Sequence, residues 1–419
     1  MLAFDRRHFM SSLTGATGAL LIGSGPNRNL IHAAGTKPRP KIRITDVKTT
    51  MLEVDWAWRR RWMLIRIETD QGIIGYGDTW ASDAARAYIM DYRRMLLGKD
   101  PTDIEKLFRQ MMGKAYINFG SAHFDSGVAA HAASGIETAL WDIAGKALET
   151  PVYKLLGGKH WDRVRLYCCV GDLPAYQRMA QVYREMGITC LKFDVTPGRV
   201  RGVPGAIMDS HLTRKGLSRL VRSVEDIRRE VGEEVEISVE ARCGTLANAM
   251  RYLKAVEPFD LTWVEDPIPA TDVEAWATLT ASSHTPTLVG EGFHLRHEFL
   301  EFFRRSATRL VAPDIQICGG IAEAKKIADL ADIHHLLTCP HNASSAIGIA
   351  AAIHSCAAMP NLLAMEFHAM PGWDRILKGY RPQISNGFID IPEGPGLGVE
   401  LDEEETRKYL MEGETYFGT

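Results

Sequence analysis

Three short apolar segments in the middle of the chain share one pattern, because each favours a β-strand and each ends in a glutamate. They are Val235–Glu240, Leu261–Glu265 and Thr287–Glu291. The glutamates are 25 and 26 residues apart, and helix-like segments lie between them at about 246–256 and 272–282. A strand–helix–strand unit of a parallel sheet has about this length. The pattern therefore predicts βα units that place the three glutamates at one edge of a sheet.

The same alternation of elements extends from residue 164 to residue 367. Strands are predicted near 164–170, 189–195, 235–241, 261–266, 287–291, 309–314, 335–340 and 362–367. Further helices are predicted near 174–186, 211–231, 321–330 and 345–359. Eight such strands fit a closed (β/α)8 TIM-type barrel, although an open doubly wound sheet fits the periodicity equally. No glycine-rich fingerprint follows the first strand, which disfavours a dinucleotide-binding fold.

The region before the barrel has a different pattern, which predicts a small α+β capping domain. The expected elements are an antiparallel meander over 42–54, 62–69 and 73–77, helical periodicity over 82–115 and an apolar helix over 128–149. The predicted divisions are a signal peptide at 1–33, the capping domain at 41–150, the barrel at 151–380, and a C-terminal tail at 381–419 that packs back on the capping domain.

The first 33 residues have the pattern of an export signal. Arg6 and Arg7 precede a weakly apolar, glycine-rich stretch from Leu13 to Ile22, and Ala33-Ala34 offers a cleavage point. Paired arginines before a mild apolar stretch are typical of twin-arginine signals, and a stretch of this length is too short to span a bilayer. We expect export to the periplasm or beyond, without a stable membrane anchor after signal removal. An attached, disordered basic N-terminus is the alternative.

Composition and charge exclude several classes of partner. The hydrophobic fraction of 46% and the charged fraction of 24% are ordinary for a globular protein. A net charge of −3, without a basic stripe and interleaved aromatic residues, argues against nucleic acid. The seven cysteines follow no metal-binding spacing and fall mostly in or beside predicted strands, so buried free thiols are expected.

The three glutamates predict a metal site. Carboxylates that converge at one sheet edge repel one another unless a cation lies among them. Carboxylate oxygens are hard ligands that favour Mg²⁺. Glu240, Glu265 and Glu291 are therefore the expected metal ligands, whereas glutamates that merely face solvent are the alternative.

Other predicted strands also end in polar residues. Lys192 and Asp194 share one face of the second strand, because side chains alternate with a period of two. Asp314 and His341 end adjacent strands, so the aspartate can hold the imidazole in one tautomer and raise its basicity. Glu366 ends the eighth strand. These residues are expected at the same edge as the metal site.

Several motifs together resemble those of one protein family. They are Gly72–Asp78, Trp141–Ala147, Pro151–Gly158, Pro313-Asp314 followed by Cys318–Ile321, and Pro392–Gly398. In this order they resemble the enolase superfamily, in its mandelate racemase and muconate lactonizing enzyme branch. The likeness covers nearly everything after residue 41.

The resemblance implies a mechanism for a small-molecule carboxylate substrate. Mg²⁺ would bind the substrate carboxylate and stabilise the enolate that forms when a base removes the α-proton. The resemblance makes His341, oriented by Asp314, the base. It makes Glu366 a hydrogen-bond donor to the substrate carboxylate, which requires a raised pKa. Because relatives form even-numbered assemblies, a homo-oligomer is expected.

Two departures from the family pattern bear on the reaction. The first metal ligand, usually aspartate, is Glu240, and the second strand carries Lys192-Phe193-Asp194 where many relatives have Lys-x-Lys. The second strand resembles galactonate-type dehydratases, which convert sugar acids to 2-keto-3-deoxy acids. Arg242 replaces their histidine acid and cannot readily donate a proton. We therefore expect Arg242 to bind substrate, and His341 to serve as both base and acid in a syn elimination.

The prediction is thus a dehydratase of an aldonic or related sugar acid, with two alternatives. One is a racemase or epimerase that uses Lys192 as its second base. The other is a catalytically silent binding protein of the same fold. Further substrate contacts are expected from Asp194, His294, His368 and Trp58, the last in a lid formed by 56–61 and 79–85.

Overall fold

The computed structural model of the protein describes residues 41–55, 59–119, 127–370 and 372–418. The predicted signal peptide and Trp58 lie outside these ranges. Within them, no helix combines the length and the apolar character needed to cross a membrane.

The capping domain begins with a three-stranded antiparallel meander, as predicted. Its strands are β1 (Ile44–Asp55), β2 (Arg59–Thr69) and β3 (Ile74–Trp80), in the order β1-β2-β3. The helices are α1 (Asp83–Leu96), α2 (Ile104–Phe119) and α3 (Val128–Ala147). The predicted helical stretch 82–115 is two helices, because Gly98 takes a φ of 74° and Pro101 follows in the connection. Residues 59–61, predicted as loop, are strand and pair with 53–55 of β1.

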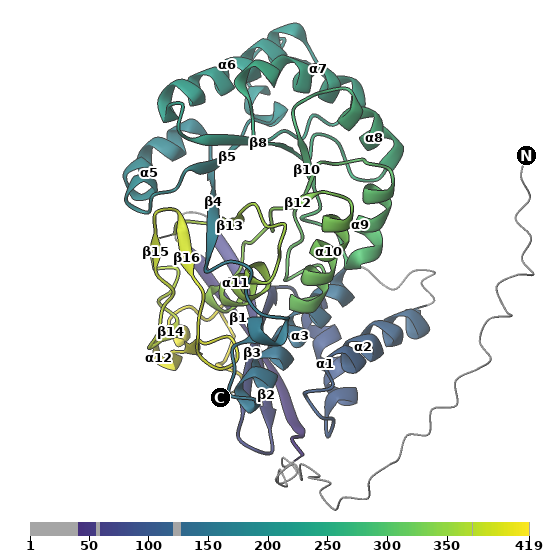
Figure 1. Cartoon of the computed structure of the whole chain (residues 1–419), viewed down its shortest axis with the longest axis vertical. Coiled ribbons are helices and arrows are strands. Elements are labelled where there is room, and N and C mark those ends of the chain that lie inside the picture. Colours follow the sequence, from purple (N-terminus) through teal and green to yellow (C-terminus); the bar gives the residue numbers. More distant parts are fainter. Residues whose placement is uncertain (1–40, 56–58, 120–126, 371, 419) are drawn as a thin grey trace, which may run out of the picture. The chain divides into compact units, whose positions relative to one another are not determined.

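Eight parallel strands form the barrel. They are β4 (Arg163–Gly171), β5 (Cys190–Asp194), β8 (Glu236–Glu240), β9 (Val264–Glu265), β10 (Thr287–Val289), β11 (Leu310–Val311), β12 (Leu337–Thr338) and β13 (Met365–Phe367). Each strand from β4 to β12 pairs with the next one in the series. Strand β13 pairs with β4. A bridge between Thr338 and Leu362 joins β12 to the segment before β13. The ring in Figure 1 is therefore closed, which confirms the barrel and excludes the open sheet.

Helices cover the outside of the barrel (Figure 1). They are α5 (Leu173–Glu185), α6 (Arg214–Val231), α7 (Leu246–Val256), α8 (Val273–Ala281), α9 (Leu295–Arg304), α10 (Ile321–Ile333) and α11 (Ala346–Ala357). Helix α6 begins three residues later than predicted, because Thr213 caps it and His211 pairs with Met208 in a small hairpin. Helix α9 is not among the predicted helices, and it buries Leu295, Phe299, Phe302 and Phe303 on one face.

The barrel interior contains large aromatic side chains and free thiols. Tyr167 and Trp263 are completely buried and meet edge to face, with ring centroids 5.0 Å apart. All seven cysteines are free; six are buried and Cys169 is half-buried, in agreement with the prediction.

Two buried carboxylates of the capping domain hold helices of the barrel. Asp78 of β3 accepts a hydrogen bond from the backbone N–H of Ser345, the N-cap of α11, at 2.7 Å. Glu137 of α3 accepts bonds from the N–H groups of Ile321 and Ala322, at the start of α10, at 2.8 and 3.0 Å. Each carboxylate satisfies amide groups that a helix start leaves unpaired. The capping domain is therefore fixed to the two helices that follow the strand ends of β11 and β12.

The C-terminal segment contacts both parts of the molecule. Its elements are β14 (Leu377–Lys378), β15 (Ile384–Ser385), β16 (Phe388–Asp390), β17 (Glu400–Leu401) and α12 (Glu403–Arg407). Strand β16 pairs antiparallel with the start of β4. Further on, the N–H of Met411 donates to the carbonyl of Met51 in β1 at 3.0 Å.

Glu137 is expected to make stability depend on pH. Burial raises the pKa of Glu137 to about 8, although the hydrogen bonds that it accepts from backbone N–H groups lower this pKa. The folded protein then holds this proton more tightly than the unfolded chain. The stabilisation is complete below the unfolded pKa and is lost as pH rises through about 8. Between pH 5 and 8, the unfolding free energy in urea should fall relative to that of Glu137→Gln by about 1 kcal/mol per pH unit, and it should level off above about pH 8.

The matched control is Glu230→Gln, which removes an exposed glutamate of α6. It should keep the pH profile of the unmodified protein. Parallel profiles for the unmodified protein and Glu137→Gln would contradict the raised pKa.

Candidate active site

The three predicted glutamates meet at the C-terminal edge of the barrel. Glu240 ends β8, Glu265 ends β9, and Glu291 follows β10 after Gly290. One carboxylate oxygen from each lies within 4.8 Å of the others. Burial and the charge of Glu265 raise the pKa of Glu240 to about 9. The shift reflects negative charge that is crowded into a small, partly buried space.

The donor set fits a hard divalent cation. Oxygens bound to one Mg²⁺ at about 2.1 Å lie up to about 4.2 Å apart, so small side-chain adjustments bring the three oxygens onto one ion. Among the described residues, Glu240, Glu265 and Glu291 are the one group of three that could hold a metal.

Lys192 lies against this cluster inside the barrel. Its ammonium is 2.5 Å from Oε1 of Glu265 and 3.2 Å from Oε1 of Glu366, and its side chain is only 4% exposed. Burial alone would lower the pKa of Lys192, but Glu265 and Glu366 raise it well above its usual value. The side chain is therefore a fixed positive charge at neutral pH.

His341 and Asp314 form the predicted dyad. Nδ1 of His341 is 2.7 Å from Oδ2 of Asp314, which is almost completely buried. Nε2 points to the carboxylates, 3.6 Å from Oε2 of Glu291 and 3.5 Å from Oε2 of Glu366. Burial lowers the pKa of His341, but Glu366 and Asp314 outweigh it and raise the pKa to about 10.

Glu366 differs from expectation. Burial opposes its ionisation, yet Lys192, His341 and His368 together lower its pKa to about 2. The expectation of a raised pKa is therefore wrong in this structure, because the ammonium of Lys192 lies beside the carboxylate. Glu366 accepts hydrogen bonds here, including one of 3.3 Å from the N–H of Asn342.

A cavity of about 420 Å³ is lined by most of these groups, but not by Glu265 or Asp314. The predicted residues among its lining are Lys192, Asp194, Glu240, Arg242, Glu291, His341, Glu366 and His368. Asp194 faces this cavity and is paired with Arg199 at 2.6 Å. Arg242 bridges two glutamates, with 2.7 Å to Glu240 and 3.3 Å to Glu291.

His294 is not in this lining. Its Nε2 lies 3.2 Å from Nε2 of His131 in α3, and the two rings stack with centroids 5.3 Å apart. The structure thus shows a contact of His294 with the capping domain, and its contact with substrate stays a prediction. Trp58, the other predicted contact, lies outside the described residues.

Arg60 is a residue of the cavity that was not predicted individually. This residue of β2 lines the cavity, and its Nη2 is 3.3 Å from Nε2 of His368. The run of arginines at 59–61 lies in the predicted lid, but the run alone does not identify which arginine faces the cavity. Side chains alternate along a strand, so Arg60 faces the cavity whereas Arg61 points the other way and pairs with Glu53.

The dyad gives a direct prediction. Asp314→Asn removes the negative charge and the acceptor that raise the pKa of His341, so this pKa should fall. Nuclear magnetic resonance of the imidazole in a pH titration measures it. Asp332→Asn, at an exposed position of α10, is the control. An unchanged titration of His341 in Asp314→Asn would contradict the hydrogen bond.

Comparison with known proteins is consistent with this geometry. Residues 40–157 match the mandelate racemase / muconate lactonizing enzyme N-terminal domain, and residues 175–405 match the enolase C-terminal domain-like family. The chain is 34% identical to a D-xylonate dehydratase from Haloferax volcanii, over 91% of this chain and 93% of the relative. It is 33% identical to a D-galactonate dehydratase from Verminephrobacter eiseniae, over 82% and 89%.

The fold is similar to solved structures of the same kind. A mandelate racemase/muconate lactonizing enzyme-like protein from Rubrobacter xylanophilus superimposes with a TM-score of 0.81 and 34% identity, covering 90% of this chain and 100% of that one. The chain therefore belongs to the enolase superfamily, in its mandelate racemase and muconate lactonizing enzyme branch, and is an enzyme related to sugar-acid dehydratases.

Proposed function

We propose that the protein is a Mg²⁺-dependent dehydratase of an aldonic or related sugar acid that forms a 2-keto-3-deoxy acid. The observation that carries the proposal is the position of His341. Its Nε2 faces the carboxylate triad across one cavity, at 3.6 Å from Glu291. A substrate bound through its carboxylate beside the triad would present its α-carbon to this nitrogen. The sugar-acid dehydratases among the relatives support the reaction class.

The triad would bind the cation, and Lys192 would balance part of the negative charge of the glutamates. A divalent cation held by Glu240, Glu265 and Glu291 would supply positive charge that offsets the negative charge formed when the α-proton leaves. Lys192 holds Glu265 through the 2.5 Å contact, so this ligand keeps its orientation. Trp263 donates to the other oxygen of Glu265 at 2.9 Å.

His341 would move the protons in both directions. Its Nδ1–H is fixed on Asp314, so Nε2 is the atom that takes the α-proton. A divalent cation held beside Glu291 would favour loss of the proton that Nε2 of His341 otherwise holds. Once protonated again, the same nitrogen can give its proton to the departing β-hydroxyl, and water leaves. Arg242 cannot take the acid role because a guanidinium does not release a proton at neutral pH.

The racemase alternative has less support. It requires Lys192 to accept a proton from the opposite face of the substrate. However, this ammonium lies between two carboxylates that raise its pKa well above the usual value. The silent binding protein is also less favoured, because Glu240 joins the other two glutamates despite its extra methylene.

Two further parts of the proposal concern the setting of the enzyme. We propose that the twin-arginine segment exports the folded protein from the cytoplasm, and that the enzyme works as a homo-oligomer. Paired arginines before a short apolar stretch support the first part. The family resemblance supports the second.

The test is keto-acid formation from a panel of aldonic acids with Mg²⁺, followed with semicarbazide. The unmodified protein should convert at least one member. His341→Asn should reduce kcat by about 10³-fold, because it removes the one proposed acid–base group. His211→Asn, which changes an exposed histidine of the small hairpin, should keep full activity.

Two results would count against the proposal. Exchange of the α-proton with D₂O, without any keto acid, would favour racemisation or epimerisation. Keto-acid formation at nearly full rate by His341→Asn would remove His341 from the base role.

A further inference from the structure

Arg242 is paired with two of the three glutamates of the triad. Its Nε donates to Oε1 of Glu240 at 2.7 Å, and its Nη2 lies 3.3 Å from Oε1 of Glu291. The third glutamate, Glu265, has Lys192 as its counter-ion instead. The two protein cations differ in freedom, because the side chain of Lys192 is buried whereas that of Arg242 is 61% exposed.

A divalent cation and this guanidinium compete for the same place. Both are positive, and at contact distance their repulsion is strong in a partly buried site. Both also use the oxygens of Glu240 and Glu291. A bound cation therefore favours any arrangement in which Arg242 has another carboxylate partner.

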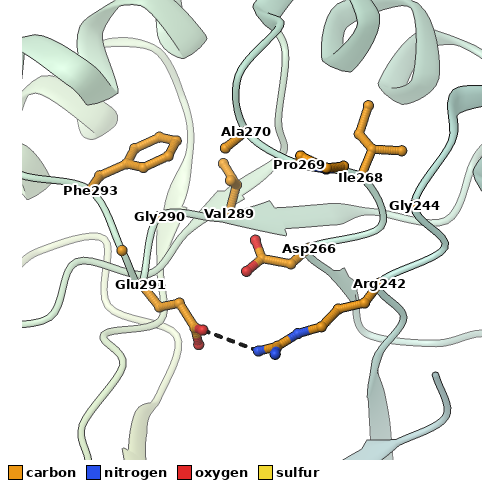
Figure 2. A pocket seen from close by; sticks show the side chains of 11 residues that line it. Arg242, Gly244, Asp266, Ile268, Pro269, Ala270, Val289, Gly290, Glu291 and Phe293 are labelled. Carbon is orange, nitrogen blue, oxygen red and sulfur yellow. Dashed lines mark hydrogen bonds and ion pairs between the residues drawn. The ribbon is translucent and has the colours of Figure 1, made fainter. Parts of the chain in front are cut away.

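Asp266 is such a partner. It lines a second cavity of about 400 Å³, together with Arg242 and Glu291. Figure 2 shows its carboxylate between the Arg242–Glu291 ion pair and the apolar side of this cavity. Within the described part of the chain, no side-chain hydrogen bond to this carboxylate is present. Among the described lining residues, it is the one carboxylate besides Glu291.

The backbone holds the two residues side by side. Arg242 follows β8 and Asp266 follows β9, and the N–H of Arg242 donates to the carbonyl of Asp266 at 3.2 Å. Their φ angles are 41° and 43°, in the left-handed region that side chains other than glycine rarely adopt. Such conformations persist where the surrounding structure imposes them, often at functional sites. The two side chains therefore start from neighbouring strand ends.

We propose that Asp266 is a positioning residue that receives Arg242 when a divalent cation binds to the triad. The guanidinium leaves Glu240 and Glu291 and pairs with Asp266. Arg242 also lines the catalytic cavity, so the exchange leaves its charge beside the substrate while it frees the metal ligands. The inference rests on the cation site of the proposed function.

A double-mutant cycle on Mg²⁺ affinity tests the exchange. Titration calorimetry at constant ionic strength would compare the unmodified protein, Arg242→Met, Asp266→Asn and the double variant. Arg242→Met should tighten Mg²⁺ binding about tenfold, because the competing cation is gone. Asp266→Asn should weaken binding about tenfold when Arg242 is present, and by less than about threefold in Arg242→Met.

The cycle separates the exchange from a simple effect of charge. If Asp266→Asn weakens binding equally in both backgrounds, Asp266 acts on the ion directly and the inference is overturned. Weaker binding by Arg242→Met would also overturn it. The matched control is Arg165→Met, which breaks an ion pair with Glu236 at the opposite end of β8, and it should leave the affinity unchanged.

Glu265→Gln distinguishes this inference from the proposed function. If this variant loses Mg²⁺ binding and the effects in the cycle are additive, the exchange of Arg242 is overturned but the cation site of the proposed function is retained. Unchanged binding in Glu265→Gln would mean that the triad is not the cation site, and both proposals would be overturned.

Discussion

Repulsion among three glutamates is the constraint on which the candidate site depends. Parallel strands of a closed barrel end at the same edge, so Glu240, Glu265 and Glu291 meet regardless of their mutual charge. Two cationic side chains of the protein offset this repulsion, and they differ in their burial. Lys192 is buried and fixed against Glu265, whereas Arg242 is exposed and bridges the other two glutamates. A site arranged in this way keeps the three carboxylates together, and the exposed Arg242 is the cation that an external ion would replace.

The capping domain contributes more than a cover for the barrel. Glu137 holds the start of α10, which follows Asp314, and Asp78 holds the start of α11, which follows His341. The two loops that carry the dyad are therefore tied to the same domain that provides Arg60 to the cavity. The 2.7 Å contact between His341 and Asp314 thus depends on the docking of the two domains.

Much of the fold and part of the site could be predicted from sequence. Strand periodicity placed the three glutamates, and the adjacency of consecutive strands paired Asp314 with His341, because these relations follow from local rules. Other features depend on contacts between distant segments. The stacking of His294 on His131 joins residues 163 positions apart. The lowered pKa of Glu366 requires Lys192 beside it, and no strand pattern encodes that distance.

The metal site is tested most directly by locating the cation itself. A crystal grown with Mn²⁺, measured for anomalous scattering, would show where a divalent ion binds. We expect one peak per chain, coordinated by carboxylate oxygens of Glu240, Glu265 and Glu291. A peak bound elsewhere, or none at the triad in a Mn²⁺-saturated crystal, would mean that these three strand ends do not form a metal site.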